Sequence, residues 1–400
     1  VGMRIVVQKF GGTSVATEES RSFVLAKVLK LKLEGFFPVV VVSAMGRSGE
    51  NYATDTLIHL LKEVNDCVNA RELDQIMCCG EMISAAVMTA TLQKAGLNTV
   101  MLNGSQAGII TDSQFSKARI QRIDTTRIFQ LINKGKIPVV CGFQGVNEFN
   151  DFTTLGRGGS DTTAAALGVA LQAERIEIYT DVEGIMTADP RLVDNTKILD
   201  KVSYDEVCQL AYQGAKVIHP RAVEIAMQKH IPLLIKSTFS DVEGTLIGDF
   251  IDDDIHDRIV TGIAYLDGLS QVKVSNIIQS EQMNLFRLLG NGGISIDLIN
   301  IYPDYIVFTI NSGATSQLLE ILEMYSTNIE IISYCAKVSI VGGGMREASG
   351  VIASFVESLS KNNIKILQTV DSHTSISALI ATSDLKNAIT FLHDRFILEK

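Results

Sequence analysis

Short apolar runs alternate with stretches of helical periodicity through the first half of this chain. A helix is predicted at residues 18–33, and strands are predicted at residues 4–8, 38–43, 99–102, 137–142 and 176–180. Strands that alternate with helices form parallel sheets, and the unbroken valines at 39–42 suit a strand that is buried on both faces. The sequence therefore predicts an α/β fold, in which a mainly parallel central sheet lies between two layers of helices.

Glycine-rich segments follow three of these strands. They begin at Gly11, at Ser43 and at Gly142. Ligands of parallel sheets bind at the carboxyl ends of the strands, and glycine lets the backbone approach a ligand closely. The pattern thus predicts a ligand site at this edge of the sheet.

The first of these segments belongs to the stretch KFGGTS at 9–14, which precedes the predicted helix. Free backbone N–H groups and the positive end of a helix dipole, next to the ammonium group of Lys9, suit a phosphate. The chain has no GxxxxGK[ST] segment, so this phosphate site differs from a P-loop. For this segment taken alone, a tight turn with a helix cap and no ligand is the alternative.

A second candidate anion site is GRGGSD at 156–161, which leads into an alanine-rich helix. Arg157 is suited to bind a carboxylate through two hydrogen bonds, and Asp161 has the alternative role of a helix N-cap. Glu81 lies near the start of a predicted apolar-faced helix, where the helix dipole alone favours a carboxylate. Lys216, taken alone, is more typical of a solvated surface charge.

The chain has 400 residues, more than one hydrophobic core usually serves, so two or three domains are expected. The composition becomes acidic near residues 240–262, which predicts a connector. Two similar passages of predicted strands and helices follow it. The predicted divisions are a first domain at 1–245, a connector at 246–262, and two α+β modules at 263–335 and 336–400. One continuous α+β domain with a chance repeat is the alternative.

Composition limits the possible partners. The formal net charge of −10 argues against a general nucleic-acid surface, so a nucleotide or an acidic substrate would have to meet locally concentrated Lys and Arg. The six cysteines form no CxxC pair, which predicts neither zinc nor a disulfide framework. No apolar run approaches the roughly 20 residues of a membrane helix, and the N-terminus does not match a signal peptide. A soluble cytoplasmic protein is expected.

Taken together, four segments resemble the amino-acid kinase family, and most closely its aspartate kinase branch: KFGGTS at 9–14, GRGGSD at 156–161, TDVEGIMTADPR at 180–191 and GAKVI at 214–218. The repeated C-terminal passages resemble a pair of ACT modules, small βαββαβ units that bind amino-acid effectors. The resemblance implies transfer of the γ-phosphoryl group of ATP to the β-carboxylate of L-aspartate. That reaction would be the first step in the biosynthesis of lysine, threonine, methionine and diaminopimelate.

The same resemblance implies roles for individual residues. Lys9 and Asp161 are the implied catalytic residues, and Lys9 would stabilise the transferred phosphoryl group. Arg157 would hold the α-carboxylate of aspartate, and Glu81 its ammonium group. The implied substrate-binding residues are Ser43, Thr54, Glu81, Arg157, Gly158, Gly159 and Ser160. The implied nucleotide-binding residues are Lys9, Phe10, Gly11, Gly12, Thr180, Asp181, Met186, Asp189, Arg191, Lys216 and Val217.

The resemblance also implies cofactors and regulation. ATP would bind with Mg²⁺, although the sequence offers no dedicated set of metal ligands. The implied effector is lysine, threonine or diaminopimelate, in that order, and ACT modules imply a homodimer or homotetramer. The chain departs from the family at Met186, where a tyrosine is common, and at residues 277–282, which replace a D-x-P-G-like stretch. The predicted effector-binding residues are Asn291, Asp297, Asn363, Ile366 and Ser372.

Two other functions stay open on the sequence alone. Another amino-acid kinase, acting on glutamate, N-acetylglutamate or UMP, is the nearest, but those enzymes usually lack a tandem ACT pair. A non-catalytic amino-acid sensor with a decayed kinase domain is the second. The intact set of Lys9, Glu81, Arg157 and Asp161 argues against decay.

Overall fold

The computed structural model describes residues 3–250, 259–277, 279–323, 328–346 and 349–398, so residues 251–258 of the predicted acidic connector lie outside the described part. The chain divides into two compact units. The first unit comprises residues 1–185, 198–208 and 216–251, and the second comprises residues 186–197, 209–215 and 252–400. The finer domain boundaries given above remain predictions.

The first unit is built on an eight-stranded sheet in the order β10-β12-β11-β9-β1-β2-β6-β3. All its neighbouring strands are parallel except β11 and β12. The strands are β1 Ile5–Phe10, β2 Phe37–Val42, β3 Thr99–Leu102, β6 Ile137–Cys141, β9 Arg175–Thr180, β10 Lys201–Ser203, β11 Leu233–Ser237 and β12 Thr245–Gly248. The predicted α/β fold with a mainly parallel sheet is therefore confirmed.

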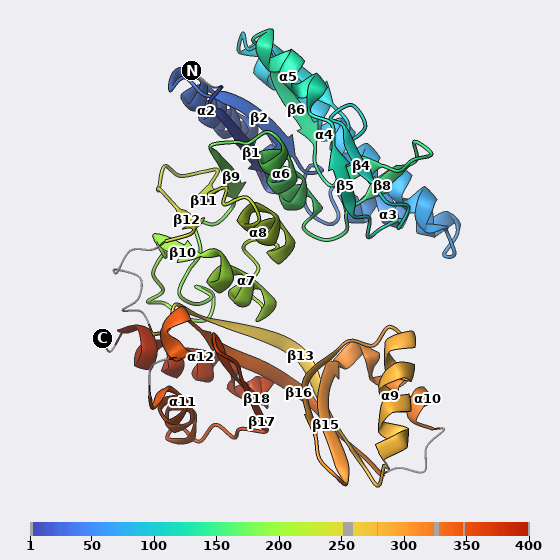
Figure 1. Cartoon of the computed structure of the whole chain (residues 1–400), viewed down its shortest axis with the longest axis vertical. Helices are drawn as coiled ribbons and strands as arrows, with labels where there is room; N and C mark the ends of the chain where they lie inside the picture. Colours follow the sequence, from blue (N-terminus) through green and yellow to red (C-terminus); the bar gives the residue numbers. More distant parts are fainter. Residues whose placement is uncertain (1–2, 251–258, 278, 324–327, 347–348, 399–400) are drawn as a thin grey trace. The chain divides into compact units, whose positions relative to one another are not determined.

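Helices cover both faces of this sheet. The helices in this part of the chain are α1 Gly12–Val15, α2 Glu18–Leu33, α3 Thr54–Val64, α4 Ala70–Lys94, α5 Thr126–Asn133, α6 Gly159–Ala170, α7 Tyr204–Tyr212 and α8 Pro220–Met227, of which α7 has residues in both units. Residues of α2 and α4 pack against Val40 and Val42 on one face. On the other face α6 lies close to β9 (Figure 1), where a Cβ on Gly168 would come within 2.4 Å of Ile176. Glycine therefore permits the close approach of α6 to the sheet.

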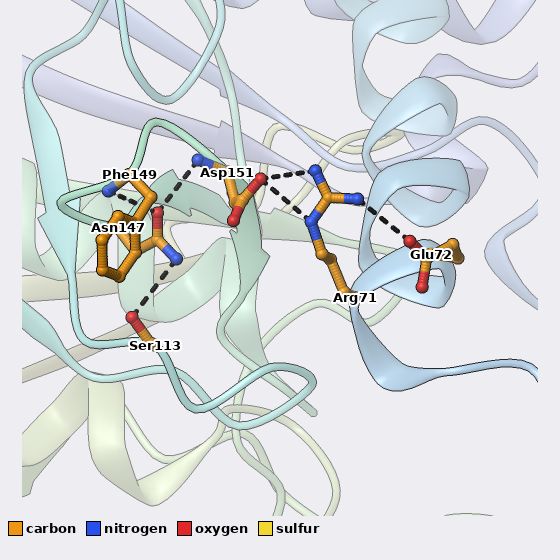
Figure 2. A network of polar contacts seen from close by, with 6 residues as sticks. All are labelled: Arg71, Glu72, Ser113, Asn147, Phe149 and Asp151. Carbon is orange, nitrogen blue, oxygen red and sulfur yellow. Dashed lines mark hydrogen bonds and ion pairs between the residues drawn. The ribbon is translucent and has the colours of Figure 1, made fainter.

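A four-stranded sheet in the order β5-β4-β7-β8 lies beside α4 in the first unit (Figure 1). Its strands are β4 Ile109–Thr111, β5 Ile120–Ile123, β7 Gln144–Val146 and β8 Phe152–Thr154. Figure 2 shows one link between this sheet and α4, in which Arg71 of the first helical turn contacts Asp151 at the start of β8. The segment at 156–161 follows β8 directly, so this small sheet determines where that segment begins.

The second unit contains a six-stranded antiparallel sheet in the order β14-β15-β13-β16-β18-β17. Its strands are β13 Gly262–Ser275, β14 Ile296–Ile301, β15 Tyr305–Asn311, β16 Asn328–Val341, β17 Gln368–Asp371 and β18 Ser375–Ala381. Its α-helices are α9 Gln279–Asn291, α10 Thr315–Leu322, α11 Val351–Ser360 and α12 Leu385–His393. Figure 1 shows α9 and α10 at one end of the sheet and α11 and α12 at the other. The predicted α+β region is confirmed.

The two ends of this sheet have separate hydrophobic cores that share the same two long strands. Val272 of β13 packs with Phe308 and Leu285 in one core. Ile263, from the other half of β13, packs with Val338 of β16 and Phe355 of α11 in the second core. Each long strand therefore contributes one half to each core.

Helix α4 is long and apolar enough to cross a membrane by length and composition, and it is the one such helix in the described part of the chain. The expectation given above concerned unbroken apolar runs, and α4 is not one, because charged residues such as Asp74 and Glu81 interrupt it. Half of its most apolar window is buried inside the protein, and Asp74 and Glu81 are among its buried residues. These properties are those of a core helix of the first unit.

Candidate active site

The carboxyl ends of the central strands meet at one edge of the large sheet. Phe10, the last residue of β1, is in register with Val42 of β2 and Tyr179 of β9. The segment after β1 therefore lies beside the segment after β2. A Cβ on Gly12 would lie only 2.7 Å from the carbonyl oxygen of Ala44, so this close approach requires glycine.

Lys9 and Asp161 contact each other at this edge. Lys9 lies near the end of β1, Asp161 lies in the first turn of α6, and Nζ and Oδ1 are 2.7 Å apart. Their side chains are only 11% and 12% exposed. Because water screens such a pair poorly, the attraction between its charges is stronger than in a surface pair. The two side chains implied to be catalytic are thus held together between the first strand and α6.

The segment at 156–161 is packed tightly against α8. Gly158 is the N-cap of α6 with a φ of 67°, and no side chain caps the helix. A Cβ on Gly158 would lie 2.2 Å from Cβ of His219, which is the N-cap of α8. The alternative role of Asp161 as the helix cap is therefore wrong. Gly159 and Ser160 are buried, whereas Arg157 is exposed.

Glu81 is almost completely buried, with 2% of its surface exposed. The backbone N–H of Ala44 donates to Oε1 over 3.1 Å, and Oε2 has no hydrogen-bond partner among the described residues. Burial raises the pKa of this carboxyl group to about 8. The prediction that it lies near a helix start is wrong, because α4 begins at Ala70, so the helix dipole does not explain its position. A buried carboxyl group with an unused oxygen is suited to bind a cation.

Two further predicted acceptor residues flank this region. Ser43 follows β2, and its backbone N–H donates to the carbonyl of Phe10. Thr54 is the first residue of α3. The loop between them carries Arg47, whose guanidinium group lies 2.8 Å from the carboxylate of Asp181 at the end of β9. An exposed ion pair thus links the loop after β2 to the segment after β9.

The predicted nucleotide residues fall into two groups. Thr180, Asp181, Lys216 and Val217 belong to the first unit, and Lys216 is exposed. Gly11 also belongs to it, and its backbone N–H donates to the carbonyl of Tyr179. The side chain of Phe10 is fully buried and stacks on Tyr179. The side chain of Phe10 is therefore a core residue and is not available to a ligand.

Met186, Asp189 and Arg191 belong to the second unit. Arg191 donates to Asp189 over 2.6 Å, and the hydroxyl of Tyr265 donates to the same carboxylate over 3.1 Å. These hydrogen bonds lower the pKa of Asp189, the Arg191 bond most strongly. In the same segment, Thr187 contacts the buried His393 of α12 over 2.8 Å. This segment is thus bound to strand β13 and to α12.

The predicted effector residues lie in three places of the second unit. Asn291 ends α9, and Asp297 on β14 forms an ion pair with the buried ammonium group of Lys337 on β16. Asn363 and Ile366 follow α11, and Ser372 follows β17. A hollow of about 310 Å³ lies beside Ser372. Its lining residues are Met345, Gly350, Val351, Ile352, Asp371, Ser372, His373 and Ile376.

The sequence analysis did not identify three residues in and near this site. Arg47 and His219 directly follow recognised segments, so their positions in the chain gave a usable signal. Asp74 gave none, because it is a single carboxylate in an apolar helix. No group of three or more His, Cys, Asp or Glu side chains that would hold a metal occurs within the described ranges.

Comparisons with known proteins agree over the whole chain. The model of the amino acid kinase family matches residues 4–237, and an ACT domain model matches residues 330–394. Aspartokinase 1 of Bacillus subtilis (strain 168) is 45% identical over 100% of both chains. The aspartokinase of Geobacillus stearothermophilus is 40% identical over 98% of this chain and 97% of its own.

Solved structures give the same result. E. coli aspartokinase III in complex with aspartate and ADP (R-state) is similar with a TM-score of 0.81 and 25% identity, over 98% of this chain and 99% of that chain. The same enzyme in complex with lysine and aspartate (T-state) is similar in fold, with a TM-score of 0.78 and 24% identity over 98% of this chain and 100% of that chain.

Proposed function

The chain belongs to the amino acid kinase family, and within it to the aspartokinases, and from this premise we propose how its residues divide the reaction between them. The enzyme transfers the γ-phosphoryl group of ATP to the β-carboxylate of L-aspartate, which gives 4-phospho-L-aspartate. The assignment of roles rests on the side chains that lie at the carboxyl edge of the large sheet. There the Lys9–Asp161 pair lies near the strand end and Glu81 has an unused buried oxygen.

The β-carboxylate of aspartate is already ionised at neutral pH, so the reaction needs no strong general base. The difficulty is repulsion, because an anionic nucleophile must approach an anionic phosphate. Lys9 is suited to stabilise the charge of the transferred phosphoryl group, and the N–H groups after Gly11 are suited to bind its oxygens. Asp161 holds the Lys9 ammonium group over 2.7 Å and so fixes its position.

The amino acid would be held at its two backbone charges. The unused oxygen of Glu81 would accept hydrogen bonds from the α-ammonium group, and Arg157 would bind the α-carboxylate. The backbone at Gly158, Gly159 and Ser160 would line the pocket. Ser43 and Thr54 would contact the side of aspartate that carries the reacting carboxylate.

The nucleotide would bind along the ends of β1 and β9, at the N–H groups after Gly11, at Thr180 and Asp181, and at Lys216 and Val217. Met186, Asp189 and Arg191 belong to the second unit, and their role in binding the nucleotide stays a prediction of the sequence. The residues of this edge fit a magnesium ion that the phosphates and water largely coordinate, since the described residues offer single carboxylates such as Asp181 and no acidic cluster. When bound, Mg²⁺ would neutralise phosphate charge.

We propose that an end-product amino acid binds the second unit, with lysine as the first candidate and threonine or diaminopimelate as the others. The hollow of about 310 Å³ beside Ser372 supports this proposal, because it is large enough for an amino acid and includes the carboxylate of Asp371. The predicted positions Asn291, Asp297, Asn363 and Ile366 lie outside its lining. Inhibition assays with each amino acid, repeated on Ser372→Ala, test this site.

We also propose a homodimer or homotetramer that forms through the second unit. Apolar side chains are exposed along its sheet: Ile301 is 58% exposed, and Tyr334 of β16 is 83% exposed. Exposed apolar groups on one sheet are typical of protein interfaces. Sedimentation of the wild type and of Tyr334→Ser tests this, and a monomeric wild type would contradict it. We expect the enzyme to be cytoplasmic.

The function itself is tested by ATP-dependent formation of an acyl phosphate, which hydroxylamine traps. We expect product from L-aspartate and little from glutamate, although one methylene alone separates two such substrates by only about 10 to 200-fold. Lys9→Ala should abolish the product, and Lys32→Ala, at an exposed position of α2, serves as the control. Binding of ATP with no product from any acceptor would favour the sensor instead.

A further inference from the structure

Asp74 is the other fully buried carboxylate of α4, and all its hydrogen bonds come from two residues. Ser116 donates to it from its backbone N–H, over 2.9 Å, and from its hydroxyl, over 3.0 Å. Thr154 donates from its backbone N–H, over 2.7 Å, and from its hydroxyl, over 2.9 Å. Both carboxylate oxygens are therefore in use.

The two residues that Asp74 binds lie at the base of the segment that carries Arg157. Thr154 is the last residue of β8, and Gly156 comes two residues later. Ser116 has a φ of 65°, which is unusual for a residue with a side chain, and its carbonyl oxygen would lie 3.1 Å from a Cβ on Gly156. The backbone N–H of Ala118 donates to the carbonyl of Thr154 over 2.9 Å. Asp74 thus joins the end of β8 to the loop that carries Ser116, at the point where the glycine-rich segment leaves the small sheet.

Asp74 and Glu81 are seven residues apart on α4. Seven residues are nearly two helical turns, so the two side chains lie on the same face, and their Cα atoms are separated by about 10 Å along the axis. Glu81 would bind the ammonium group of aspartate. Asp74, which anchors the loop of Arg157, therefore lies on the same helix as Glu81, the proposed partner of the ammonium group.

We propose that Asp74 is a positioning residue for the amino-acid substrate, because it sets the distance between the Glu81 carboxylate and the loop that presents Arg157. This inference rests on the proposed roles of Glu81 and Arg157. Asp74 does not contact the substrate in this account. It acts through Thr154 and Ser116, which fix the start of the glycine-rich segment.

The structure provides a matched control between the same two elements. Arg71, one turn before Asp74 on α4, binds Asp151 next to β8 over 2.6 Å, and their side chains are 49% and 22% exposed (Figure 2). Asp151 is held in turn by Asn147, which accepts from its backbone N–H. This outer link connects α4 to the start of β8, whereas Asp74 connects α4 to its end. Arg71→Gln should therefore leave recognition of the substrate unchanged.

The test compares two ligands that differ only at the α-carboxylate. We would measure KM for L-aspartate, KM for ATP, and the inhibition constant of the α-amide of aspartate against L-aspartate, in the wild type and in Asp74→Asn. We expect KM for aspartate to rise about tenfold, the loss of roughly one charge-assisted hydrogen bond. The inhibition constant of the α-amide and KM for ATP should change by less than about twofold, because the amide lacks the charge that Arg157 binds.

A second variant guards against a general loss of structure. Thr154→Val removes one of the four donor groups and leaves the other three, so KM for aspartate should rise by a smaller factor, while the inhibition constant of the α-amide and KM for ATP again stay nearly unchanged. If aspartate and its α-amide are weakened equally in both variants, Asp74 stabilises the fold without positioning the loop. Arg157→Ala separates the two proposals: equal weakening of both ligands there would contradict the role of Arg157 itself.

Discussion

The buried carboxyl groups of Asp74 and Glu81 differ in how many hydrogen-bond partners the protein gives them. Asp74 accepts hydrogen bonds from Ser116 and Thr154 at both oxygens, whereas Glu81 accepts one, from Ala44, and has one oxygen without a partner. Burial raises the pKa of each, and hydrogen bonds oppose the shift at both, from the backbone alone at Glu81 and from backbone and side chains at Asp74. An unsatisfied buried polar group is costly. The protein thus supplies the partners of Asp74, and the free oxygen of Glu81 supports the proposal that a ligand binds there.

The largest expected effect is on activity at Glu81. Glu81→Gln keeps the shape of the side chain but removes the charge, so kcat/KM for aspartate should fall by about 10² to 10³-fold, the cost of a broken buried charge pair. Steady-state kinetics measure this, with Glu72→Gln on the same helix as the control, since Glu72 is half-exposed and pairs with Arg71. A loss below tenfold would mean that the ammonium group binds elsewhere.

The next effect is on stability at Asp74. Asp74→Ala leaves the donors of Ser116 and Thr154 buried without an acceptor, so the free energy of unfolding should fall by about 3 kcal/mol. Denaturant titration measures it. Glu81→Ala, which leaves only the N–H of Ala44 without its acceptor, should cost less. Equal losses in the two variants would remove the contrast between the two regions.

The pH dependence tests the state of Glu81 more finely. Its pKa in the free enzyme is raised to about 8 by burial, so the group is mainly protonated at pH 7, and only its ionised form attracts an ammonium group. The profile of kcat/KM for aspartate, which reports the free enzyme, should rise by up to about tenfold per pH unit below the pKa of about 8 and level off above it. Glu81→Gln should lose this rise. A level profile in the wild type between pH 6 and 8 would contradict the shifted pKa.

The smallest effect belongs to the exposed link of α4. Arg71→Gln should change the free energy of unfolding by less than about 1 kcal/mol, because surface ion pairs contribute little. Thermal melts with and without added salt measure it. A large loss would show that the outer link, and not Asp74, anchors the small sheet to α4.

Local patterns of the sequence predicted the elements that depend on local forces. The helix at 18–33 has the predicted limits, with Thr17 as its cap, and so does the strand at 99–102. Lys9 and Asp161 were identified by the segments that contain them. The limits of α4 were not predicted, because Gly80 reads as an interruption. In the structure Gly80 lies inside the helix, where a Cβ would come within 3.0 Å of Ala44.

The environment of Asp74 was not predictable for a different reason. Its partners lie 42 and 80 residues away in the chain, so no local pattern announces them. The same holds for β13 and β16, whose halves belong to different cores. Each is one continuous strand of 14 residues, and only the elements beside it show that it contributes to two cores.

The most direct test of the difference between the two carboxyl groups is proton release when aspartate binds. Calorimetric titration at pH 7, in two buffers of different ionisation enthalpy, counts these protons. If the ammonium group of aspartate binds Glu81 and lowers its raised pKa, nearly one proton should leave per aspartate bound. Glu81→Gln should release none, and Asp74→Asn should release as many as the wild type. Binding without proton release in the wild type would contradict the account, because Glu81 would then not be the group that ionises to bind the ammonium group of aspartate.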